Sequence, residues 1–146
     1  MPLANASTEV PTRKTISEVV SMLVEYGAAA VTVQRDAQNL PSGIGFVLPT
    51  AAGAREFVLP ARAEAVRKTL IRQGVRIGLT SLEHSQAVAW RIVKDWLRAQ
   101  LALVESGQVE FAEVMLPFLI LETHGQRQTL YQAFTTGRAL PGATAS

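Results

Sequence analysis

Residues 80–107, with the sequence TSLEHSQAVAWRIVKDWLRAQLALVESG, decide the fold because they form the longest helical pattern of the chain. Thr80 and Glu83 have the spacing of a capping box, in which two side chains accept hydrogen bonds from the first N–H groups of a helix. Gly107 supplies the left-handed residue that commonly follows the last turn. We therefore expect one long helix between these boundaries.

Most of the surface of this expected helix is apolar. Its charged residues fall into one stripe, about a third of the circumference wide at about 100° per residue. They are Glu83, Arg91, Lys94, Asp95, Arg98 and Glu105. Trp90 and Trp96 lie on the wide apolar side, which favours packing in the core over a role in stacking on bases or binding a partner. A helix with so little polar surface must be covered on more than one side.

The residues before this helix predict a smaller helix and three strands. Thr15 and Glu18 form a second capping-box pattern, apolar residues follow at helical spacing, and Gly27 ends the pattern. Apolar and polar residues then alternate as in half-buried strands. The expected strands cover residues 28–35, 44–48 and 55–59. Strands this close in sequence form an antiparallel meander, because a parallel crossover needs a dozen or more residues.

The remaining segments predict short elements. Residues 61–73 are expected to form a second helix that buries Ala63, Val66 and Leu70 and ends at Gly74, with Glu64 placed to pair with Lys68 four residues on. Residues 75–79 are expected to form a short strand or a connector. Residues 109–119 are expected to form a short helix whose length Pro117 limits. Around Gly125 we expect either two extended pieces or one extended piece followed by a helical turn.

These elements predict a single α+β domain. Its small antiparallel sheet of about three strands packs against the N-terminal helix and the long amphipathic helix. We expect the domain to cover residues 15–134, with a mobile tail over 1–14 and a disordered tail over 135–146.

Composition excludes several classes of protein. The chain has no cysteine, which excludes disulfides, thiolate zinc sites and a cysteine nucleophile. No apolar run approaches the roughly 18 residues of a membrane span, and the N-terminus lacks the apolar stretch of a signal peptide. We expect a cytoplasmic protein with no membrane partner.

The sequence contains no group of residues in a pattern that indicates an enzyme active site. His84 and His124 are too few and too far apart to suggest a metal site. The glycines of Gly43-Ile44-Gly45 lack the third glycine of a phosphate-binding loop, so a tight turn or close strand packing is the better interpretation. We predict a non-catalytic protein with no catalytic residues, no metal and no cofactor.

The distribution of charge gives the only functional direction. The net charge is +2, but basic residues exceed acidic residues only between residues 61 and 107. Basic side chains on one helix and its exit can bind phosphates by charge and hydrogen bonding. The predicted nucleic-acid-binding residues are Arg55, Arg62, Arg67, Lys68, Arg72 and Arg76. The alternative is a solvated helix face whose long stems cover the core.

Several phrases of the sequence resemble a known group of proteins. They are FVLP at residues 57–60, the run from Trp90 to Leu119 with AQLALVESGQVEFAEVMLPFL, and TLY at 129–131 after a glycine turn. The chain thus resembles a family of small, mostly uncharacterised proteins encoded by bacteriophages and prophages, over roughly residues 15–132. The resemblance implies a phage context and the host cell cytoplasm, and it carries no catalytic signature.

Two functions follow as hypotheses. The first is a non-catalytic phage-type accessory protein that binds single-stranded nucleic acid, or nucleic acid without sequence preference, through the basic helix. The alternative is a phage-encoded adaptor or inhibitor that binds a host or phage protein in an anti-defence or assembly role, or that forms a homo-oligomer through apolar surface.

Overall fold

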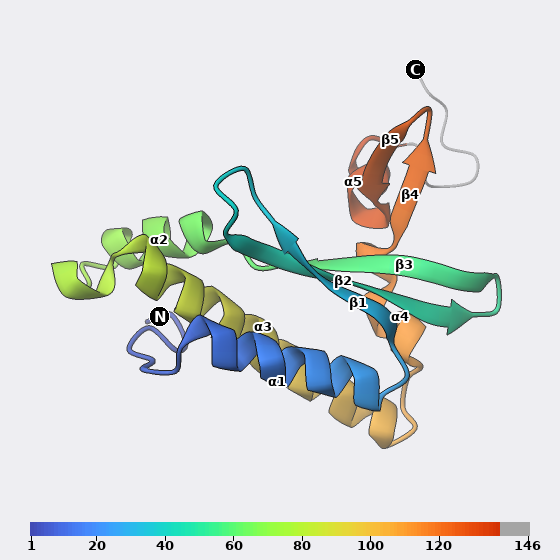
Figure 1. Ribbon diagram of the computed structural model, residues 1–146, viewed down its shortest axis with the longest axis horizontal. Helices are drawn as coiled ribbons and strands as arrows, with labels where there is room; N and C mark the ends of the chain where they lie inside the picture. Colours follow the sequence, from blue (N-terminus) through green and yellow to red (C-terminus); the bar gives the residue numbers. More distant parts are fainter. Residues whose placement is uncertain (138–146) are drawn as a thin grey trace.

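The computed structural model describes residues 1–137 and has an α+β fold. Three antiparallel strands form a sheet in the order β1-β2-β3, and two helices, α1 and α3, run side by side along one of its faces (Figure 1). The bounds are β1 (Ala29–Arg35), β2 (Pro41–Thr50), β3 (Gly53–Pro60), α1 (Thr12–Glu25) and α3 (Leu82–Glu105). The predicted fold class and meander are confirmed.

The other elements lie at the two ends of this layer. Helix α2 packs against α3 at one end, and the C-terminal elements lie at the other end of the sheet, where a second small sheet projects away from α3 (Figure 1). Their bounds are α2 (Ala63–Arg72), the 3₁₀ turn η1 (Ile77–Leu79), α4 (Phe111–Met115), the 3₁₀ turn η2 (Leu116–Phe118), β4 (Ile120–Thr123), β5 (Gln126–Thr129) and α5 (Leu130–Thr135). Within residues 1–137, no helix combines the length and the apolar character that crossing a membrane requires.

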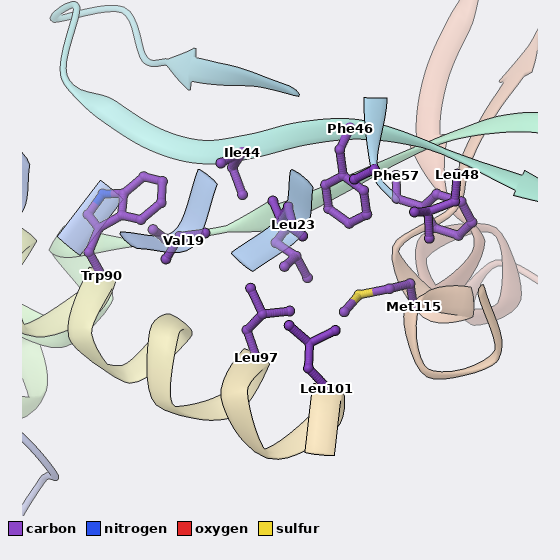
Figure 2. Packing of buried hydrophobic residues seen from close by; sticks show 13 residues of the cluster. Val19, Leu23, Ile44, Phe46, Leu48, Phe57, Trp90, Leu97, Leu101 and Met115 are labelled. Carbon is purple, nitrogen blue, oxygen red and sulfur yellow. The ribbon is translucent and has the colours of Figure 1, made fainter. Parts of the chain in front are cut away.

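The core lies between the sheet and the two long helices. Alternate residues of β2 point toward the helices and are buried, and Phe46 stacks on Phe57 of β3 with ring centroids 5.9 Å apart. Leu97 rises from α3 into the same layer (Figure 2). Trp90 is 1% exposed, and its Nε1 donates to the Pro41 carbonyl at 3.3 Å. Its expected place in the core is confirmed.

Both long helices begin at other residues than the sequence predicted. Ser81 caps α3, because its hydroxyl accepts from the N–H of His84 at 3.1 Å, whereas the Thr80 hydroxyl donates to the Ile77 carbonyl. Helix α1 begins at Thr12 with Pro11 at its N-cap, four residues before the predicted cap at Thr15. The capping boxes predicted at residues 80 and 15 are therefore wrong.

The N-terminal segment, predicted to be a mobile tail, contacts α2 and α3. The N–H of Leu3 donates to Gln73 at 3.0 Å, the amide of Asn5 donates to Asp95 at 2.8 Å, and His84 Nε2 lies 2.6 Å from the Ala6 carbonyl. Mobility in solution stays a prediction. Of the predicted C-terminal tail, residues 138–146 lie outside the described part of the chain.

Lys94 lies in the predicted polar stripe of α3, but it is buried. Its ammonium group pairs with the carboxylate of Glu18 on α1, and Arg91 Nη1 lies 3.4 Å from the same carboxylate. The hydrogen bond from Lys94 lowers the pKa of Glu18 below its ordinary value of 4.5, aided by the charges of Lys94 and Arg91 and opposed by burial. Polar contacts thus join the two helices beside the core.

We expect Glu18→Gln to reduce the pH dependence of stability. Because the folded state lowers the pKa of Glu18, the stabilisation is present above pH 4.5 and is lost as the pH falls through the lower folded pKa. The urea midpoint of the unsubstituted protein should therefore fall more steeply between neutral pH and pH 3 than that of the variant. Glu25→Gln, at an exposed acid of the same helix, is the control. Identical pH profiles for Glu18→Gln and the unsubstituted protein would contradict the assignment.

Gly43 allows β2 and β3 to pack closely. A Cβ atom at this position would lie 2.7 Å from the carbonyl oxygen of Leu59, which belongs to the backbone and cannot rotate away. The predicted close strand packing is confirmed.

Gly43→Ala should lower the free energy of unfolding by about 1–3 kcal/mol in urea denaturation. Gly78→Ala is the control, because no atom lies within 4 Å of its added Cβ. Equal stability of the two variants would exclude the steric explanation.

Candidate nucleic-acid interface

Helix α2 presents one apolar side and one polar side. Leu70 is fully buried and Val66 is partly buried against the domain, as the sequence predicted. Glu64 in the first turn and Arg72 in the last turn complement the helix dipole. Gly74, with a φ of 71°, takes the left-handed conformation that ends the helix. The residues opposite Leu70 therefore face solvent.

Three of the predicted residues are exposed cations of α2 and of the loop that follows it, which we call the basic face and define as Lys68, Arg72 and Arg76. Lys68 and Arg72 are four residues apart and thus lie on the same side of α2. Arg76 follows in the loop after the helix, and all three side chains are exposed. Within residues 1–137, no carboxylate lies within 4.0 Å of these cations. Their charges are available to an external anion.

Arg67 has an internal role instead. Its Nε donates to the Thr80 carbonyl at 3.0 Å, and its Nη1 lies 3.4 Å from the Glu64 carboxylate. Glu64 therefore pairs with Arg67, and the predicted pair with Lys68 is wrong. These contacts link α2 to the segment before α3, although the Arg67 side chain is still 43% exposed.

The two remaining predicted residues lie away from the basic face. Arg55 is in the first half of β3, beside the β2–β3 turn, and its Nη1 donates to the Ala54 carbonyl at 3.1 Å. At about 3.3 Å per residue, most of the strand separates Arg55 from α2, which begins beyond the other end of β3 (Figure 1). Arg62 immediately precedes α2 and lines a cleft at the start of the helix. The six residues thus do not form one patch.

The loop after α2 adds features that sequence analysis did not assign. Ile77 is 91% exposed between Arg76 and Gly78. The N–H groups of Ile77 and Gly78 donate to no acceptor in the described part of the chain. Backbone N–H groups beside a basic side chain are common phosphate contacts. Gly74 and Gly78 are the sequence signal that indicates an exposed turn here, although the sequence of residues 75–79 is also compatible with a short strand.

The histidines occupy separate environments. His84 lies against the N-terminal segment, whereas His124 lies in the turn between β4 and β5 with a φ of 53°. Among residues 1–137, no three His, Asp or Glu side chains are grouped so that they could hold a metal ion.

Comparison with protein-family models, with curated proteins and with solved structures finds no match for this chain. The resemblance to phage-encoded proteins stays a prediction. The function is therefore inferred from the geometry of the site.

Proposed function

We propose that this protein is a non-catalytic accessory factor of the phage type that binds nucleic acid through the basic face. The observation that supports the proposal is the exposure of Lys68, Arg72 and Arg76, on α2 and the loop after it, with no acidic partner within residues 1–137. Cations that already have carboxylate partners contribute less to binding phosphate, because the ligand must replace an existing interaction.

The geometry favours contact with the phosphate backbone over reading of bases. The helix has ten residues, about 15 Å at 1.5 Å per residue, and its exposed side carries long flexible cations. Such side chains bind phosphates without sequence information. Each phosphate contact releases condensed counterions from the nucleic acid, so it steepens the dependence of log K on log salt by about 0.7 for single strands and about 0.9 for duplexes. Three contacts predict a salt-dependent binder of modest affinity.

A second candidate function is supported by apolar surface in the C-terminal elements. Leu116 is 48% exposed, and α5, which packs on η2, carries Tyr131 and Phe134 with 61% and 50% exposure. Exposed aromatic residues are enriched in protein interfaces. These residues suit the alternative of an adaptor or inhibitor that binds a host or phage protein, or of a homo-oligomer.

Reversal of two charges tests the nucleic-acid proposal. We expect Lys68→Glu with Arg72→Glu to weaken binding to a labelled single-stranded oligonucleotide by at least about tenfold near 50 mM salt, because two phosphate contacts become repulsive. Fluorescence anisotropy measures the affinity. The control is Arg55→Glu with Arg98→Glu, which changes the net charge equally at exposed positions outside the basic face. An equal loss in both variants would assign binding to overall charge, and absence of binding at low salt would overturn the proposal.

The alternative makes a separate prediction about mass. A homo-oligomer that uses the C-terminal elements should give a mass above the 15.8 kDa of one chain in light scattering, and Tyr131→Ser with Phe134→Ser should restore the monomer mass. Ile71→Ser with Ile77→Ser removes exposed apolar side chains elsewhere and should leave the mass unchanged. A monomer mass for the unsubstituted protein at every concentration would exclude this form of the alternative.

A further inference from the structure

A cleft of about 540 Å³ lies at the start of α2. Its walls come from the β1–β2 turn, the first turn of α2 and the first turns of α3. This volume falls within the range of about 300–1,000 Å³ that is typical of small-molecule sites. Much of the wall is apolar, with Leu40, Pro41 and Leu82 among the lining residues. The cleft can therefore hold a molecule with an apolar body.

The first turn of α2 opens into this cleft without a side-chain cap. Arg62 occupies the N-cap position and makes no capping hydrogen bond, and Ala63, Glu64 and Ala65 line the cleft. In the described chain, the N–H groups of these three residues have no acceptor. Free N–H groups at the positive end of a helix dipole favour an anion.

Within residues 1–137, Gln86 adds an unpartnered polar side chain to the wall of the cleft. The residue is only 8% exposed, lines the cleft from α3, and has no side-chain hydrogen bond to any described residue. No fully enclosed side-chain nitrogen or oxygen lacks a partner within residues 1–137, so the amide of Gln86 must open to accessible space. It also lines the adjoining cleft beside residues 8–13 and thus forms part of a shared wall. The amide is therefore accessible and free to exchange hydrogen bonds with water or with a bound molecule.

Of the charged residues that line the cleft in the described chain, Arg62 is the cation, and it has no carboxylate partner. The carboxylate of Asp36 accepts from the N–H groups of Gln38 and Leu40, each at 2.9 Å. Glu64 pairs with Arg67 at 3.4 Å. Arg62 is exposed and has no carboxylate within 4.0 Å in the described chain. Both carboxylates stay negatively charged and oppose an anion, although their contacts are within the protein. The guanidinium of Arg62 and the helix N–H groups are the parts of the cleft that can attract an anion.

We propose that this cleft holds one nucleotide unit of a bound single strand. The phosphate binds the N–H groups of Ala63 to Ala65 and the guanidinium of Arg62, and the base lies against the apolar wall. The amide of Gln86 donates to and accepts from the hydrogen-bonding edge of the base, as glutamine does in base recognition. The inference deepens the proposed function, because the cleft lies at one end of α2 and Arg72 of the basic face lies at the other.

Titration of the ¹⁵N-labelled protein with 5′-AMP, adenosine and inorganic phosphate in separate samples tests the cleft directly. We expect 5′-AMP to shift the backbone signals of Ala63, Glu64 and Ala65 together with the side-chain amide of Gln86. Phosphate alone should shift only the helix signals, and adenosine alone should shift only the Gln86 amide. Absence of shifts at these positions with saturating 5′-AMP would overturn the inference, and shifts confined to the basic face would do the same.

Two substitutions separate the phosphate contact from the base contact. Ala63→Pro removes one N–H at the first helical position, where proline is favoured and Arg62 already has extended backbone. It should weaken both 5′-AMP and phosphate about tenfold, as expected for a hydrogen bond to a charged group. Gln86→Met keeps the length of the side chain and should weaken 5′-AMP but not phosphate. Unchanged affinities in both variants, with folding verified by circular dichroism, would overturn the inference.

The two proposals fail in different ways. If oligonucleotides bind and depend on Lys68 and Arg72, but 5′-AMP leaves the cleft signals unchanged, the cleft inference is wrong and the basic face stands. If 5′-AMP binds at Ala63 to Ala65 while oligonucleotides do not bind at low salt, the cleft is a mononucleotide site. The proposed function is then wrong, and so is the part of the inference that places a single strand in the cleft.

Discussion

The apolar surface of α3 is the constraint on which the rest of the structure depends. A helix of 24 residues with a narrow charged stripe cannot be stable in water alone, so it must be covered by several other elements. The sheet covers it through Phe46 and Phe57, α1 covers a second side, and Phe118 packs edge-on against Trp96 at 5.7 Å. Helix α2 covers its N-terminal part. The other elements are therefore arranged around α3 so that its apolar surface is buried.

The same constraint explains why Lys94 is buried. Helix α1 lies close to α3 and buries Val19 and Leu23 (Figure 2). This closeness places part of the charged stripe in the interface. Buried charges are tolerated when they are paired and hydrogen-bonded. Glu18 provides that pairing for both Arg91 and Lys94. Glu18, which the sequence predicted as part of a capping box, is therefore part of the contact between the helices.

Periodicity predicted the elements of the fold, because a core with a sheet and two helices imposes periods of 2 and 3.6 on the sequence. The helix starts were not predictable from local pattern, because neighbouring hydroxyls compete for the same role. Thr80 and Ser81 can both cap α3, and the choice depends on the turn at Ile77 that engages the Thr80 hydroxyl. In the candidate site, the sequence identified the cations but not their partners. Arg67 is distinguished from Lys68 by its contacts with Thr80 and Glu64. Arg55 is distinguished by its position, because most of β3 separates it from α2.

Gln86 shows the same limit at the cleft. In the sequence it is one polar residue near the start of a long helix, and glutamine is common at such positions. Its burial arises because α2, the β1–β2 turn and α3 converge around it, and no local pattern encodes that convergence. Polar residues on rigid helices hold their donors in fixed positions, whereas the long side chains of the basic face must be ordered when they bind. A single-stranded nucleic acid that contacts both ends of α2 would be attracted by the cations of the basic face at the C-terminal end. At the N-terminal end, the cleft would fix which nucleotide lies there.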